Sequence, residues 1–125
     1  MIVRQPIVAG QFYGGSRDKC IGQLEECLAK SIDNNDLPEV VRGIVVPHAG
    51  WVVSGATAGL AFQAAKKINV QVDTFVLLGA GHRYSGNFPA VYNEGKWASP
   101  LGEIEVDSDL GGSILQNCSK VGTDL

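Results

Sequence analysis

The sequence has no hydrophobic run long enough to cross a bilayer and no cluster of basic residues. The apolar stretches near residues 41–46 and 74–78 are much shorter than the roughly 20 residues that a transmembrane helix needs, and no basic stretch leads into an apolar signal core. We therefore expect neither membrane insertion nor secretion. Lys and Arg are scattered over a chain of net charge -3, so no nucleic-acid partner is expected.

Cysteine is also scarce and follows no pairing pattern. The three cysteines are an odd number with no C-x-x-C motif, which favours a reducing compartment, and we expect a cytoplasmic protein. We interpret all three as small, buried hydrophobic residues. The 125 residues, 45% hydrophobic and 18% charged, are typical of a single globular domain over residues 1–125.

The N-terminal third predicts an extended arm followed by a helix. Residues 1–15 place glycines and a proline around apolar anchors, which indicates an arm that packs across another element. Apolar residues then recur at helical spacing from Ser16, the expected N-cap, to about Ile32. A polar cluster at residues 33–38 ends this segment.

The middle of the chain predicts strand, helix and strand in that order. Residues 40–46 and 74–78 are continuous apolar runs, typical of strands buried on both faces. Between them lies an alanine-rich helix that Ser54 is expected to cap and that ends near Ile68. This order predicts two parallel strands joined by a right-handed crossover, hence an α/β fold with a mainly parallel sheet and flanking helices.

The C-terminal third predicts smaller elements. Residues 88–92 and 104–106 are expected to be short strands that form an antiparallel addition. Asp107 or Ser108 is expected to cap a last helix.

The only two histidines, His48 and His82, each follow one of the predicted parallel strands, 34 residues apart. Ligands of open α/β sheets bind at the carboxyl ends of the strands, and neighbouring strands lie about 4.8 Å apart. We therefore expect both imidazoles at one edge, where they can share a metal ion. Spacing indicates no third ligand for such a site.

Glycine-rich connections at the same edge are candidates for ligand binding. Gly50, Ser54 and Gly55 lie at the start of the crossover helix, where unpaired N–H groups and the helix dipole favour an anion. Gly81 lets the backbone approach a ligand closely. Arg83 adds a fixed positive charge that favours an anionic group.

Four motifs lie in order along the chain. They are Arg4-x-Pro6-x-Val8-Ala9-Gly10-x-Phe12-Tyr13, Val46-Pro47-His48-Ala49-Gly50-Trp51 with Ser54-Gly55, Leu78-Gly79-Ala80-Gly81-His82, and Ser99-Pro100-Leu101-Gly102 with Val106-Asp107. Together they resemble motifs of the Memo family, whose members are similar in fold to the catalytic subunit of class III extradiol dioxygenases. The resemblance covers essentially the whole chain and implies that the chain is the N-terminal half of such a fold, incomplete at its C-terminus.

The resemblance implies a metal-binding cleft in which His48 and His82 are catalytic metal ligands for iron, copper or zinc. Phe12 stands where the family has a tryptophan in its ligand-binding cleft. The family's third ligand is a later cysteine to which Cys118 does not correspond. No nucleotide cofactor is expected.

Three functions follow from these observations. The first is a metal-dependent oxidoreductase- or hydrolase-like domain acting on a small molecule. The second is a non-catalytic module that binds a peptide or a small anion in the same cleft, and the third is an inactive, truncated remnant. Because half of a larger sheet leaves an apolar edge and face uncovered, we expect a homo-oligomer or a complementing C-terminal half.

Overall fold

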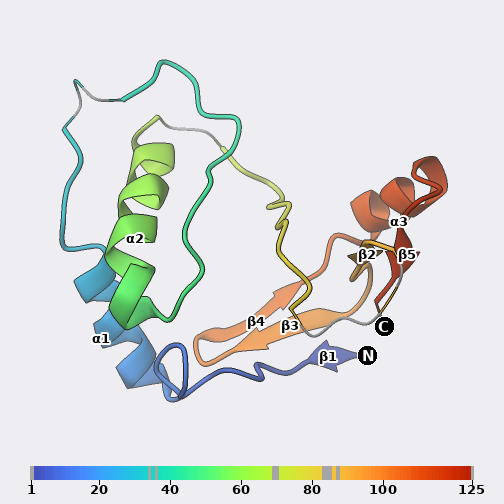
Figure 1. The fold of residues 1–125 in the computed structure, drawn as a ribbon, viewed down its shortest axis with the longest axis horizontal. Coiled ribbons are helices and arrows are strands. Elements are labelled where there is room, and N and C mark those ends of the chain that lie inside the picture. The colour runs from blue at the N-terminus through green and yellow to red at the C-terminus, as the bar shows by residue number, and fades with distance from the viewer. Residues whose placement is uncertain are drawn as a thin grey trace. The chain divides into compact units, whose positions relative to one another are not determined.

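A computed structural model describes residues 2–33, 35, 37–68, 71–82, 86 and 88–124. Over these residues the chain forms three helices and five short strands (Figure 1), which confirms the mixed α/β class. They divide into two compact units. The first unit contains Met1–Gln5, Val72–Ala98 and Gly102–Leu125, and the second contains Pro6–Gln71 and Ser99–Leu101. None of the described helices is both long and apolar enough to span a membrane.

In the second unit, helix α1 (Arg17–Cys27) is shorter than the sequence predicts. It ends four to five residues before Ile32, the expected end. The reason is a set of polar contacts with the following helix, because Gln63 Nε2 donates to the carbonyl of Leu28 at 2.9 Å and Lys67 Nζ donates to the carbonyl of Ile32 at 2.6 Å. These side chains satisfy carbonyls without a further helical turn.

The two helices of this unit begin in different ways. Ser16 is the N-cap of α1, as predicted. Helix α2 (Trp51–Lys67) starts three residues before Ser54, so the predicted cap is wrong, and Gly50 takes the N-cap position. The N–H of Trp51 donates to the carbonyl of Phe12 at 2.8 Å. Because the arm supplies this acceptor, the first turn of α2 needs no side-chain cap.

Helices α1 and α2 approach closely through two buried glycines of α2. A Cβ atom at Gly55 would collide with the Sγ atom of Cys27, and a Cβ atom at Gly59 would collide with the carbonyl oxygen of Cys27. Cys20 of α1 is fully buried. The small residues of α2 therefore allow backbone contact between the helices.

The first unit contains two small sheets. One has the order β1-β3-β4, and its β1 and β3 strands pair in parallel, with Val3 opposite Lys96 and Arg4 opposite Trp97. In the other, β2 pairs with β5 in parallel. The bounds are β1 (Val3–Arg4), β2 (Ala90–Val91), β3 (Lys96–Ser99), β4 (Gly102–Glu105), α3 (Ser108–Asn117) and β5 (Gly122–Thr123).

The smaller C-terminal elements agree in part with their predictions. Short strands occur at both expected places, but β2 pairs with β5 in parallel, so the expected antiparallel addition is wrong for residues 88–92. Asp107 is the N-cap of α3, as predicted.

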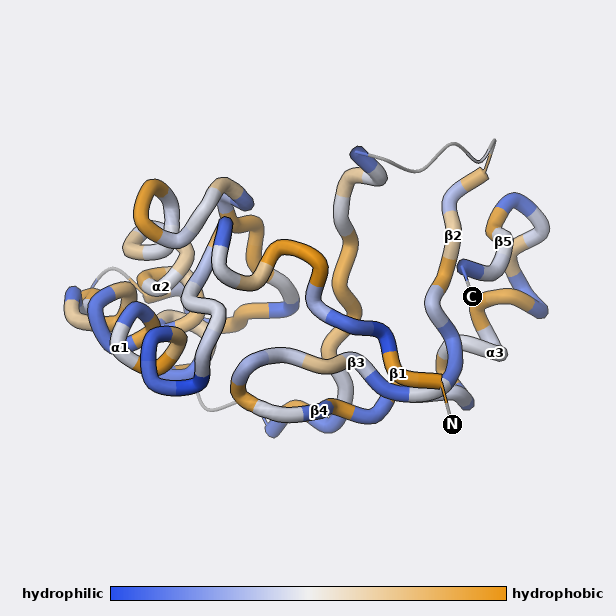
Figure 2. The backbone as a smooth tube through the Cα atoms, turned by 90° about the horizontal axis from the view of Figure 1, so that it is seen from below, coloured by the Kyte–Doolittle hydropathy of each residue, from blue (hydrophilic) through white to orange (hydrophobic). Residues whose placement is uncertain are grey.

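The two long apolar runs differ most from the prediction. The described structure places residues 40–46 and 74–78 in neither a helix nor a strand, so the expected parallel pair of strands is wrong for these residues. Figure 2 shows hydrophobic colour along segments that carry no strand or helix label. A continuous apolar strand is stable only when strands flank it and both of its faces are covered. Within the described residues nothing pairs with either run.

Candidate functional site

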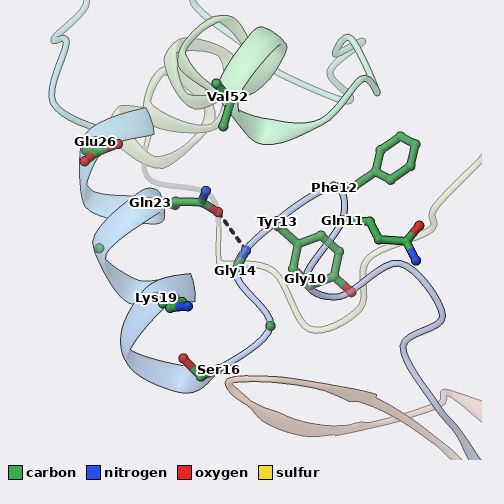
Figure 3. A pocket seen from close by; sticks show the side chains of 12 residues that line it. Gly10, Gln11, Phe12, Tyr13, Gly14, Ser16, Lys19, Gln23, Glu26 and Val52 are labelled. Carbon is green, nitrogen blue, oxygen red and sulfur yellow. Dashed lines mark hydrogen bonds between the residues drawn. The ribbon is translucent and has the colours of Figure 1, made fainter.

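The second unit contains a hollow of about 590 Å³ between the N-terminal arm and the first two helices (Figure 3). Residues 10–16 of the arm form one wall. The opposite wall comes from α1, and Val52 contributes from the first turn of α2. The α1 residues in the lining are Lys19, Gly22, Gln23 and Glu26.

The spacing of the α1 residues explains why they share the hollow. Lys19, Gln23 and Glu26 are separated by four and three positions, which places them on one face of a helix. Gly22 lies on the same face, and a Cβ atom built there would meet nothing within 4 Å. The missing side chain at Gly22 therefore leaves part of the hollow open.

Hydrogen bonds fix the arm against both helices. The N–H of Gly14 donates to Oε1 of Gln23 at 2.7 Å, the dashed line in Figure 3. The arm itself turns tightly, because the N–H of Gly10, at a φ of 82°, donates to the carbonyl of Tyr13 at 2.7 Å. The ring of Tyr13 lies 5.3 Å from that of Trp51. One wall of the hollow is thus held in place before any ligand enters.

A second hollow of about 160 Å³ lies between α1 and α2. It shares Gln23, Glu26 and Val52 with the first and adds Cys27, Trp51 and Ala56. The two spaces are therefore neighbours along the same helix face.

The lining combines apolar and charged side chains. Phe12 and Val52 are both exposed, while Lys19 and Glu26 carry opposite charges and stand seven positions apart on α1. Figure 3 shows these two side chains about two turns apart on the helix, with Gln23 between them. Such a surface accommodates a molecule with an apolar body and a charged or hydrogen-bonding end.

The structure places the predicted ligand-binding residues of this unit in two roles. Phe12 lines the hollow. Gly50, Ser54 and Gly55 build the junction of the arm with the helices: Gly50 packs against Phe12, and Ser54 is buried with its hydroxyl donating to the carbonyl of Ala49 at 2.9 Å. Direct contact of these three residues with a ligand stays a prediction.

The two histidines belong to different units. His48 precedes α2 in the second unit, and His82 follows the apolar run 74–78 in the first. Both residues are exposed, as is Gly81. Their shared metal site stays a prediction, and Arg83 lies outside the described residues.

The described residues do not by themselves fit a metal ion. Nowhere among them do three or more His, Cys, Asp or Glu side chains gather to hold one. Iron, copper and zinc centres need at least three protein donors as a rule. The three cysteines are unpaired, with Cys20 buried, Cys27 half-buried and Cys118 exposed, so only the first matches the expected burial fully.

Asp107 in the first unit has a structural role. Its Oδ1 accepts the N–H of Leu110 at 2.9 Å, and its Oδ2 accepts the hydroxyl of Thr74 at 2.5 Å. The Thr74 hydrogen bond and then the Leu110 hydrogen bond lower the pKa of this carboxyl below its usual value. The ionised carboxylate of Asp107 therefore links the first turn of α3 to Thr74, the first residue of the apolar run 74–78.

Reasoning from the sequence missed the α1 wall of the hollow. Its signal is the pattern Lys19, Gly22, Gln23 and Glu26, in which polar residues at helical spacing surround a glycine. A polar helix face is normally solvated surface. Only the position of the arm shows that this face borders a hollow.

Comparisons with known proteins agree over nearly the whole chain. Residues 4–124 match the Memo-like protein family. A MEMO1 family protein of Thermococcus onnurineus is 41% identical over 92% of this chain and 38% of its own length. Those of Methanopyrus kandleri and Pyrobaculum arsenaticum are 32% and 36% identical, over 98% and 100% of this chain and 45% and 46% of theirs. The chain thus spans less than half the length of these relatives.

Proposed function

Because this chain belongs to the Memo family, we propose that its arm, α1 and α2 bind a small molecule that carries both an apolar and a charged group. The supporting observation is the hollow of about 590 Å³, a volume within the range of about 300–1,000 Å³ typical of small-molecule sites. The pre-fixed arm favours this role, since an ordered wall lowers the entropic cost of binding.

The two charges of α1 predict which end of the ligand lies where. Lys19 attracts an anionic group at the arm side of α1, and Glu26 attracts a cationic group near α2. Benzoate and benzylamine are suitable probes because each joins one aromatic ring to one charge. Substituting Lys19→Met should weaken benzoate selectively, and Glu26→Gln should weaken benzylamine selectively.

Gly22 gives the sharpest test, because a side chain there enters the open hollow. Isothermal titration calorimetry with both probes should show binding to the wild-type chain and at least about tenfold weaker binding to Gly22→Leu. Gly22→Ala is the matched control, since its single methyl group leaves most of the space open. Equal binding by Gly22→Leu and wild type, or no binding of either probe to wild type, would contradict the proposal.

The second candidate function is the metal-dependent oxidoreductase- or hydrolase-like activity that the family resemblance implies. It is supported by the presence of both histidine motifs within residues 4–124, the part that matches the family. His48 and His82 are proposed as two donors for iron, copper or zinc. Further donors must come from outside the described residues, because those residues offer no set of three.

Metal analysis of the tag-free chain tests this second candidate. We expect bound iron, copper or zinc in the wild type and its loss in the double variant His48→Ala with His82→Ala. Absence of metal together with probe binding would identify a non-catalytic binding module. Absence of both would identify an inactive remnant.

We further propose a cytoplasmic location and a partial extradiol-dioxygenase-like fold. The location is supported by three unpaired cysteines, which suit a reducing compartment. The fold is supported by family membership and by the share of the relatives that the chain covers.

A further inference from the structure

The two charges on the α1 wall of the hollow stand a fixed distance apart, because both belong to one regular helix. Lys19 and Glu26 are seven positions apart on α1, and a helix rises about 1.5 Å per residue, so their Cα atoms lie about 10 Å apart along its axis. Gly22 lies between them, and a Cβ atom there would meet nothing within 4 Å. The wall therefore presents a positive and a negative charge with open space between them.

Contacts within the protein do not explain these two charges. Among the described residues, neither Lys19 nor Glu26 takes part in an ion pair or a side-chain hydrogen bond. The helix dipole favours acidic residues in the first turn and basic residues in the last, whereas Lys19 lies in the first turn of α1 and Glu26 in the last. A ligand that brings an anionic group to Lys19 and a cationic group to Glu26 is attracted by the side chains and by the dipole alike.

Gln23 supplies a hydrogen-bond donor between the two charges. Its Oε1 atom accepts the N–H of Gly14 at 2.7 Å, and because an N–H bonds only to an acceptor, this contact fixes which way the amide is turned. The Nε2 atom faces away from Gly14, as Figure 3 shows, and no described hydrogen bond uses it. A ligand carbonyl near the middle of the wall can therefore accept a hydrogen bond from Nε2.

We infer that the hollow takes a linear zwitterion whose ammonium and carboxylate groups lie about 10 Å apart, with a carbonyl acceptor near its middle. This inference rests on the proposed small-molecule site and specifies its ligand. A tripeptide with free ends has this chemistry, because three extended residues span about 10 Å. Its carboxylate lies at Lys19, a central carbonyl at Gln23 and its ammonium at Glu26, and an apolar central side chain covers Phe12 and Val52 of the lining.

A peptide series tests the length of the ligand with the wild-type chain. Glycyl-leucyl-glycine is the probe, and the amide chemical shifts of Gly22 and Gln23 in NMR titrations report binding at the hollow. We expect it to bind about two- to fivefold more tightly than leucyl-glycine or glycyl-glycyl-leucyl-glycyl-glycine, because each of these reaches only one of the two charges.

Capped forms of the same tripeptide test each charge separately. N-acetylation removes the ammonium and C-terminal amidation removes the carboxylate, and each should weaken binding about two- to fivefold, as is typical of exposed ion pairs. In Lys19→Met the amidated form should bind as well as the free acid, and in Glu26→Gln the acetylated form should bind as well as the free amine. Glu25→Gln is the matched control, because Glu25 is exposed and outside the lining, and it should keep both preferences.

Gln23→Glu tests the donor between the charges. Glutamate keeps an acceptor for the Gly14 N–H and replaces the Nε2 donor with an oxygen. The variant should weaken glycyl-leucyl-glycine about three- to tenfold relative to 8-aminooctanoate, a zwitterion of similar length without an amide. Both probes carry the same two charges, so the added negative charge cancels in this ratio. An unchanged ratio would overturn the inference in favour of a simple ω-amino acid as the ligand.

The results separate this inference from the proposed function. Suppose that the peptides did not bind, or that length and capping made no difference, while benzoate and benzylamine bound and lost affinity in Gly22→Leu. The zwitterion would then be wrong and the small-molecule site would stand. Absence of binding by the peptides and by both aromatic probes would overturn the inference and the proposed function together.

Discussion

Replacing Arg4 with methionine should destabilise the first unit, because this side chain contacts three others from separate parts of the chain. Its guanidinium carbon lies 5.0 Å from the ring centre of Trp97 and 5.3 Å from that of Tyr92. Its Nη1 atom lies 2.9 Å from Oδ2 of Asp124. Arg4 thus connects β1 and β3 of one sheet to the residues that follow β2 and β5 of the other.

The expected loss is about 1–2 kcal/mol. The side chain of Arg4 is 39% exposed, so the ion pair contributes about 0.2–1 kcal/mol and each cation–π contact about 0.5–1 kcal/mol. Methionine retains some packing against the rings, which places the loss in the lower part of the summed range. Strands of two residues, such as β1 and β2, contribute few ladder hydrogen bonds of their own, so the cluster is a large share of what holds this unit.

Urea unfolding of a Trp51→Phe background gives the measurement, because Trp97 is then the only tryptophan. With a slope of about 2 kcal/mol per molar urea, Arg4→Met should lower the midpoint by about 0.5–1 M. Arg4→Lys should give an intermediate value, since it keeps the charge without the planar group. Combining Arg4→Met with Asp124→Asn isolates the ion pair.

A midpoint shift below about 0.2 M would refute this account of the first unit. So would a loss that disappears entirely in 1 M salt, where the screening length is about 3 Å. In that case the ion pair alone would stabilise the unit, and the rings would contribute nothing.

Two further predictions concern α3 and the α1–α2 contact. The Thr74 hydroxyl and a backbone N–H of α3 lower the pKa of Asp107 in the folded protein. The ionised carboxylate therefore stabilises the fold above the pKa that Asp107 has in the unfolded chain, and this stabilisation is lost as the pH falls below about 4. Asp107→Asn should remove this part of the acid dependence in thermal unfolding from pH 6 to pH 2. Gly55→Ala should destabilise the second unit by about 1–3 kcal/mol, and Cys27→Ala should rescue it because the clash is with Sγ. The same replacement should not rescue Gly59→Ala, whose clash is with a backbone carbonyl, and equal rescue of both in chemical unfolding would contradict this packing.

The sequence predicted correctly those helix starts that depend on neighbouring residues. Ser16 and Asp107 are N-caps in the structure as in the prediction. These features depend on short-range chemistry, so a sequence can reveal them.

The features that the sequence did not predict depend on contacts between distant segments of the chain. The end of α1 depends on Gln63 and Lys67, and the start of α2 depends on the carbonyl of Phe12. The segment 74–78 has the composition of a strand but no described strand beside it. Likewise, the hollow exists only because the arm closes over a polar face of α1. Spacing along the sequence contains no information on such partners.

The bond between the Trp51 N–H and the Phe12 carbonyl also has a kinetic consequence. It joins positions far apart in the chain, so it forms only after the intervening loop has closed, and such distant pairings slow folding. The junction of the arm with α2 therefore forms only after this loop has closed. The contact of the arm with α1 needs no such closure, because Gly14 and Gln23 are nine positions apart.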